Sequence, residues 1–189
     1  MGKKITEDVS LLGRPYPRSP AVVTVHSRGR SNALAVGAYC HMSDEPPLYG
    51  IAISPKRFSY ELICESGEFG INFFPLEAAE LILALGDLSG RDVDKFTKLN
   101  LAIDKPVKIS APLLADAYVS YECKIVDRMN IGDHVWFVGK ILAAHYREEV
   151  FTDKMALDLD KIKPALYIKR NLFLTADKLT LKRVKGPDK

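Results

Sequence analysis

Residues 117–145 carry the strongest strand pattern in the chain. They divide into AYVSYECKIVDRM (117–129), NIGD (130–133) and HVWFVGKILAAH (134–145). In the first segment the apolar side chains recur with a period of two and so share one face of a strand: Val119, Tyr121, Cys123 and Ile125. The last segment is apolar on both faces, as in a strand between packed layers or at the centre of a barrel. The short Asn/Gly/Asp connection predicts that the two segments form an antiparallel hairpin.

Shorter segments on both sides add several strands and few helices. Further strands are predicted at 21–25, 48–54, 67–74, 165–168 and 179–184. Helices are predicted at 59–66, with Ser59 as the N-cap, and at 76–86, and a glycine stops each of them. Many short strands with few helices are typical of a β-barrel rather than of alternating βαβ units. We therefore predict one mainly β domain with added helices over residues 1–189, because no repeat, linker or low-complexity tract divides the chain.

The composition is that of a soluble globular protein. Of 189 residues, 47% are hydrophobic and 27% are charged, and the formal net charge is +3. This charge is too small to indicate nucleic-acid binding by itself. The three scattered cysteines have no C-x-x-C spacing and fit a reducing compartment. No apolar run is long enough to span a membrane and no signal core stands at the N-terminus, so we expect a cytoplasmic protein without a membrane partner.

The common catalytic and nucleotide-binding motifs do not occur in this sequence. There is no G-x-G-x-x-G, no phosphate loop of the G-x-x-x-x-G-K-[ST] type, no G-x-S-x-G and no H-E-x-x-H. Cys40 and His41 are adjacent, but neighbouring residues of a strand point to opposite faces and could hardly bind one ion. We expect no metal site.

The segment ISPKRFSYELICESGEFGIN (53–72) places hydroxyls and cations between a predicted strand and a predicted helix. The amides of a first helical turn are unpaired, and their partial positive charge favours an anion such as phosphate. Arg57 could add a bidentate contact, and Ser54 and Ser59 could add hydroxyl donors. The alternative is a solvated turn in which Ser59 only caps the helix.

Three other segments hold candidate ligand-binding residues. SRGRSNALAVGAY (27–39) is a turn followed by small residues, which let backbone groups approach a flat ligand, although a tightly packed hairpin would also need them. SGRDVDKF (89–96) places Lys95 beside an aromatic residue, either near a ligand or at the start of an exposed, salt-bridged helix. GDHVWF (132–137) places His134 at the mouth of a strand, where it could meet a ligand or be merely structural.

In their order and spacing these segments resemble the flavin reductase-like family of FMN-binding split β-barrels, which includes the prokaryotic flavoredoxin-type NAD(P)H:flavin oxidoreductases. The resemblance extends from RPYPRSPAVVTV through GKILAAH. It is carried by SNALAVGAY, DEPPLYGIAISPKRFSYELICESGEFGINF, SGRDVDKF and GDHVWFVGKI.

The resemblance implies a homodimer that binds FMN non-covalently near the subunit interface, without a Rossmann domain. By this resemblance, Asn32 and Ala33 would line the flavin ring, and Ser54, Arg57 and Ser59 would hold the phosphate and ribityl chain. Lys95 would reach the flavin and Tyr167 would pack over its ring. His134 would lie near the nicotinamide. Many relatives carry Thr, Ser or Trp where this chain has Ala35, Gly37 and Ala38, so the resemblance does not extend to the polar contacts and stacking that those residues would give the ring.

The predicted function is therefore hydride transfer from NADH or NADPH to FMN, with His134 as the candidate catalytic residue and an unspecified onward acceptor. The alternative within the same fold is an FMN-containing electron carrier that a partner protein reduces. A third possibility is an oligonucleotide-binding barrel that uses basic residues near 28–30 and 56–57. The modest net charge disfavours it.

Overall fold

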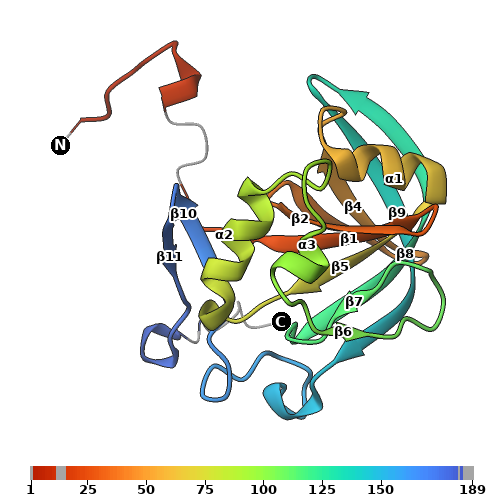
Figure 1. Ribbon diagram of the computed structural model, residues 1–189. Helices are drawn as coiled ribbons and strands as arrows, with labels where there is room; N and C mark the ends of the chain where they lie inside the picture. The colour runs from red at the N-terminus through yellow and green to blue at the C-terminus, as the bar shows by residue number, and fades with distance from the viewer. Residues whose placement is uncertain (1, 12–15, 183, 185–189) are drawn as a thin grey trace.

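The computed structural model describes residues 2–11, 16–182 and 184. Its main element is a seven-stranded antiparallel sheet with the strand order β2-β1-β5-β8-β9-β4-β3 (Figure 1). The strands are β1 (Ala21–Ser27), β2 (Arg30–Val36), β3 (Tyr39–Asp44), β4 (Pro47–Ile53), β5 (Glu68–Phe73), β8 (Val119–Ile131) and β9 (His134–Tyr146). The mainly β fold with added helices is confirmed.

The predicted hairpin forms the long centre of this sheet. β8 pairs antiparallel with β9 from Ile131↔His134 to Val119↔Tyr146, and Gly132 occupies the left-handed region in the turn, with φ +58°. The turn is shorter than the sequence suggests, because the first strand continues through Asn130 and Ile131. β9 also pairs with β4, so it is an interior strand, as its apolar residues on both faces predict.

The core lies inside the curved sheet and beneath one helix. Phe69 of β5, Ile51 of β4 and Phe137 of β9 are fully buried there, together with Leu62 and Ile63 of the covering helix α1 (Phe58–Ser66). Complete burial of each such side chain contributes roughly 1.5–3 kcal/mol. Gly67 ends α1 in the left-handed conformation, with φ +69°, as predicted.

A second layer covers the face of β1 and β2 that points away from this core (Figure 1). It contains the 3-10 turn η2 (Leu76–Ala78), α2 (Ala79–Asp87) and α3 (Lys95–Lys98). Two small hairpins complete the layer, β10 (Leu166–Lys169) with β11 (Leu172–Leu174) beside α2, and β6 (Ile103–Asp104) with β7 (Leu113–Leu114). The remaining turns are η1 (Val9–Leu11), η3 (Glu148–Val150) and η4 (Lys178–Thr180).

Three local predictions are wrong. Gly86 does not stop the second predicted helix, because α2 continues through it to Asp87. Residues 179–184 do not form a strand: η4 covers the first of them, 181, 182 and 184 have no regular structure, and 183 lies outside the described residues. Leu179 and Leu181 are largely exposed, so this apolar pattern has no sheet edge to pack against. Ser59 is not the N-cap of α1, because the helix begins one residue earlier and Arg57 takes that position.

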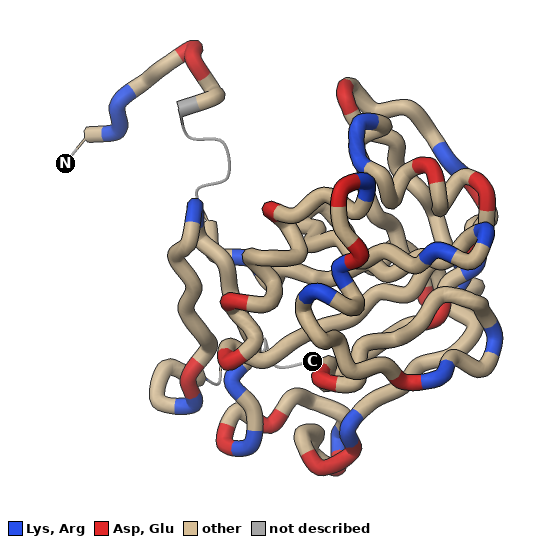
Figure 2. Tube along the Cα trace, viewed as in Figure 1, with Lys and Arg blue, Asp and Glu red and all other residues tan. Residues whose placement is uncertain are grey.

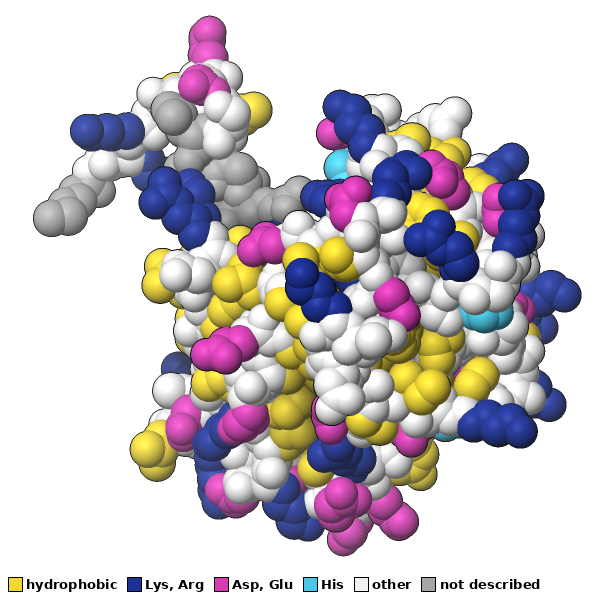
Figure 3. All heavy atoms as spheres, viewed as in Figure 1, with side chains coloured by type: hydrophobic (Ala, Val, Ile, Leu, Met, Phe, Trp, Pro, Cys, Tyr) yellow, Lys and Arg dark blue, Asp and Glu magenta, His cyan; other side chains and the backbone are white. Residues whose placement is uncertain are grey.

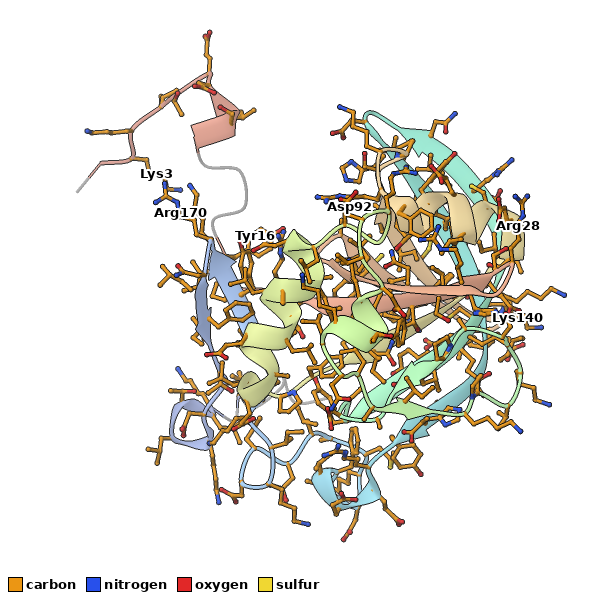
Figure 4. The ribbon with its side chains drawn as sticks, in the orientation of Figure 1. Lys3, Tyr16, Arg28, Asp92, Lys140 and Arg170 are labelled. Carbon is orange, nitrogen blue, oxygen red and sulfur yellow. The ribbon has the colours of Figure 1, made fainter. Side chains whose placement is uncertain are left out.

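Charged residues of both signs are interspersed over the surface. Figure 2 shows Lys and Arg next to Asp and Glu along most loops, and Figure 3 shows hydrophobic side chains scattered among them on the face in view. Arg28, at the β1–β2 turn on the right of Figure 4, pairs with Glu65 of α1 at 3.1 Å. Among the described residues, no helix is both long enough and apolar enough to cross a bilayer.

Candidate functional site

The junction between β4 and α1 presents an uncapped helix N-terminus. The Arg57 amide donates to the Ser54 carbonyl at 2.9 Å, which turns the chain from the strand into the helix. Arg57 takes the N-cap position with extended dihedrals, φ −84° and ψ 141°, and no side chain caps the helix by a hydrogen bond. The first amides of α1 and the exposed Arg57 side chain therefore offer positive charge to an anion at this point.

A buried hydrogen bond lies directly behind this helix terminus. The side-chain amide nitrogen of Asn32 donates to the Ser59 hydroxyl oxygen at 2.8 Å, and Asn32 is only 3% exposed. Gly90 packs so closely against Asn32 that a Cβ at this glycine would meet the Asn32 amide group. The contact connects β2, α1 and the loop after α2, and it fixes their relative positions.

Lys95 is a buried cation in the same region. It is only 2% exposed, and its Nζ donates to the carbonyl oxygens of Ala33 at 2.7 Å and Leu85 at 2.8 Å. Within the part of the chain that the structure describes, no carboxylate lies at ion-pair distance from it. Burial, and then the positive charge of Arg57, lower the pKa of Lys95 to about 8. A buried charge without a counter-ion is costly, so these two cations favour a bound anion.

Arg57, but not Lys95, lines a cavity of about 300 Å³. Its lining combines Arg57 with small residues of β2 and α2 and with the β10–β11 hairpin. The lining residues that bear on ligand binding are Arg18, Ala35, Gly37, Arg57, Gly86 and Tyr167. This volume is at the lower end of the range for small-molecule sites. The cavity thus brings together the small residues, the guanidinium and the aromatic ring that the sequence places far apart.

Arg18 is a residue of this cavity that sequence reasoning missed. Its backbone and that of Tyr167 exchange two hydrogen bonds, of 3.1 Å and 2.7 Å, and its guanidinium carbon lies 5.7 Å from the centre of the Tyr167 ring. Tyr167 in turn packs edge-on against Phe173 at 5.3 Å. The only signal in the sequence is Pro17 and Pro20 on either side, which favour an extended backbone before β1.

Ser54 and His134 lie near the junction but are not among the residues that line the cavity. The pairing of Ile53 with Val135 places His134 at the same end of the sheet as Ser54. The Nδ1 atom of His134 lies 2.7 Å from a carboxylate oxygen of Asp133, and this hydrogen bond lowers the pKa of Asp133. Asn32, Ala33, Ser59 and Lys95 are buried and do not line the cavity either.

A larger cavity, of about 640 Å³, touches the other end of the loop that follows α2 and contains none of the predicted site residues. It is lined by Arg30 and Lys105 together with Asp94 and Asp104, so charges of both signs compensate within it. Asp92, labelled in Figure 4, belongs to the loop next to this cavity. The smaller cavity is the better candidate for an anionic ligand because its cations outnumber its acids.

Comparison with known proteins identifies the class to which this fold belongs. The chain matches the flavin reductase like domain over residues 12–174, and it therefore belongs to the flavin reductase-like family. The arrangement of its strands is the split β-barrel of FMN-binding flavin reductases.

The relatives include proteins with and without a described activity. The chain is 33% identical over 156 residues to an uncharacterized protein of Aeropyrum pernix, a match that covers 82% of this chain and only 59% of that relative. It is 29% identical over 135 residues to the NADH-dependent FMN reductase AsuE2 of Streptomyces nodosus subsp. asukaensis, with 70% of each chain covered.

Solved structures of flavin-related proteins have a similar fold. The FMN-binding protein of Thermus thermophilus, in a crystal structure with bound 1-cyclohex-2-enone, is 28% identical with a TM-score of 0.84, covering 97% of this chain and 99% of that one. Flavoredoxin from Methanosarcina acetivorans has a TM-score of 0.80 at 23% identity over 99% and 95% of the chains, which shows the shared fold alone.

Proposed function

We propose that this protein is an FMN-binding oxidoreductase that accepts a hydride from NADH or NADPH and passes the electrons to a further acceptor. The observation that carries the proposal is the buried Lys95, which lies close to Arg57 and to the uncapped N-terminus of α1, beside a cavity with an aromatic wall. The names of relatives such as the NADH-dependent FMN reductase AsuE2 support it.

The residues at the β4–α1 junction would hold the phosphate of FMN. The first amides of α1, the Arg57 guanidinium and the Lys95 ammonium group supply positive charge there, and Ser54 borders the turn. Asn32 and Ser59 would act from behind, because both are buried and hydrogen-bonded to each other. The Ala33 carbonyl would orient Lys95.

The isoalloxazine ring would occupy the cavity next to Ala35, Gly37 and Tyr167, where small side chains leave the backbone accessible. FMN, when bound, supplies the group that accepts the hydride, and the protein orients it and shields it from water. His134 would approach a nicotinamide from the β8–β9 turn, because it lies at the same end of the sheet as the junction.

We also propose a homodimer in which a second copy borders the flavin, and a reducing, cytoplasmic location. The first rests on the family resemblance. For the second, Cys40 and Cys64 are exposed, Cys123 is buried, and all three are free thiols.

A second candidate function is an FMN-containing electron carrier that a partner protein reduces. The position of His134 favours it, since this residue does not line the cavity. In that case the same flavin site would serve a protein partner instead of a nicotinamide.

An anaerobic reduction experiment tests the proposal and separates the two candidates. The purified protein is loaded with FMN, and the flavin absorbance is followed after addition of NADH or NADPH. Rapid bleaching supports the oxidoreductase; bleaching by dithionite but by neither nucleotide supports the carrier. Failure to bind FMN would refute both. In the oxidoreductase case, a His134→Ala variant that oxidises NADH at the wild-type rate with saturating FMN would exclude a catalytic role for His134.

A further inference from the structure

The flavin cavity contains a second guanidinium that the phosphate site does not need. Of the described residues that line it, Arg18 and Arg57 are cationic and Asp87 alone is acidic. Arg57 lies close enough to Lys95 to lower its pKa, so these two cations belong to one group. Arg18 instead acts electrostatically on Tyr39, where its charge opposes the effect of burial on the tyrosine pKa, and it packs over Tyr167.

Several independent contacts hold the Arg18 side chain in place. The paired backbones of Arg18 and Tyr167 fix its origin, and the Tyr167 ring lies against its guanidinium group. On the β2 side, a Cβ at Gly37 would come within 2.7 Å of the guanidinium carbon, so the glycine leaves the space that this group occupies. The guanidinium is therefore pre-organised on the cavity wall between an aromatic ring and main chain.

Flavin chemistry creates a charge that such a group would stabilise. Addition of a hydride, which is two electrons and one proton, to the neutral isoalloxazine leaves one negative charge on the ring unless a second proton is taken up. A fixed cation at the ring stabilises that anionic reduced form more than the neutral oxidised form. We propose that Arg18 performs this role and so raises the reduction potential of the bound flavin, an inference that rests on the proposed function.

The test measures flavin binding in both redox states rather than turnover. Dissociation constants of oxidised and dithionite-reduced FMN, and the midpoint potential by anaerobic spectroelectrochemistry, are compared for wild type, Arg18→Gln and Arg18→Lys. For Arg18→Gln we expect binding of reduced FMN to weaken about tenfold more than binding of oxidised FMN, equivalent to a potential lower by about 30 mV for a two-electron couple. Arg18→Lys keeps the charge and should restore most of the difference.

A second variant keeps the charge but displaces it. Gly37→Ala would push the end of the Arg18 side chain away from β2, and it should lower the potential in the same direction, which also provides a test if Arg18→Gln does not fold. Arg57→Gln is the comparison variant: it should weaken FMN far more than riboflavin, which has no phosphate, and it should shift the potential less than Arg18→Gln does.

The outcomes distinguish this inference from the proposed function. If wild type binds no FMN in either state, the proposed function fails. If it binds FMN but Arg18→Gln and Gly37→Ala keep the wild-type potential, the inference alone is refuted. Equal losses for both redox states that disappear with riboflavin would make Arg18 a phosphate ligand and would also refute it.

Discussion

The protonation of Lys95 should control the affinity for FMN. The pKa of Lys95 is lowered to about 8, first by burial and then by Arg57, so its charge in the ligand-free protein is lost from pH 8 upward. A phosphate with nearly two negative charges would restore it. A unit charge about 4 Å away at an effective dielectric constant of about 20 contributes about 4 kcal/mol, enough to raise the Lys95 pKa by about three units.

We therefore expect FMN affinity to be highest below about pH 7 and to fall as the pH rises through 8. With a pKa of about 8 in the free protein and above about 10 in the complex, the dissociation constant increases about thirtyfold between pH 7 and pH 9.5. Fluorescence titration at a series of pH values measures this, and titration with riboflavin corrects for ionisation of the ring itself. Lys95→Met should bind FMN weakly with a flat profile. A wild-type profile that is equally flat would refute the reasoning.

Three further predictions concern the stability of the fold. Gly90→Ala should lower the free energy of unfolding, measured in urea, by about 1–3 kcal/mol, because the added Cβ breaks the buried contacts of Asn32. The control Gly86→Ala in helix α2 should cause no such loss, because its Cβ would lie at an ordinary 3.6 Å from its neighbour. Equal losses in the two variants would contradict this. Burial alone would raise the pKa of Glu122, but backbone and side-chain hydrogen bonds hold this pKa below its usual value. Glu122→Gln should therefore be less stable than wild type at neutral pH, and the difference should disappear in acid. A stability difference that does not change with pH would count against this. Asp94→Ala removes the N-cap of α3 and should lower the free energy of unfolding by about 1 kcal/mol. Asp94→Asn should lower it little. Similar losses in both variants would show that Asp94 does not act as a cap.

The strands with local signals could be predicted from the sequence, and those that depend on distant contacts could not. The β8–β9 hairpin has both its apolar alternation and its turn residues within one short segment. In β2, by contrast, Asn32 and Ala33 are buried only because α1, α3 and the loop after α2 cover them. A strand of small and polar residues covered in this way has no apolar pattern of its own. The error at 179–184 is the reverse. That segment has an apolar pattern, but no distant segment covers it, and it forms no strand.

In the candidate site, too, the local features could be predicted from the sequence and those that depend on distant contacts could not. The cations and hydroxyls of the β4–α1 junction could be proposed from the sequence, because an anion site at a helix N-terminus needs only neighbouring residues. That Lys95 is buried rather than on an exposed helix follows from its contacts with two distant carbonyl groups. Arg18 reaches the cavity by pairing with Tyr167, far along the chain, and its position requires the fold.

The burial of Lys95 also gives the ligand-free protein a pH dependence of opposite sign. Its pKa is about 8 in the folded state and 10.5 for an unburied lysine, so the unfolded chain binds more protons between these limits. The free energy of unfolding without FMN therefore rises with pH across this window, while FMN affinity falls. Urea unfolding of wild type and Lys95→Met, with and without FMN, separates the two slopes. One lysine accounts for both only if the substitution removes both; loss of one slope alone would show that the phosphate site and the buried cation are independent.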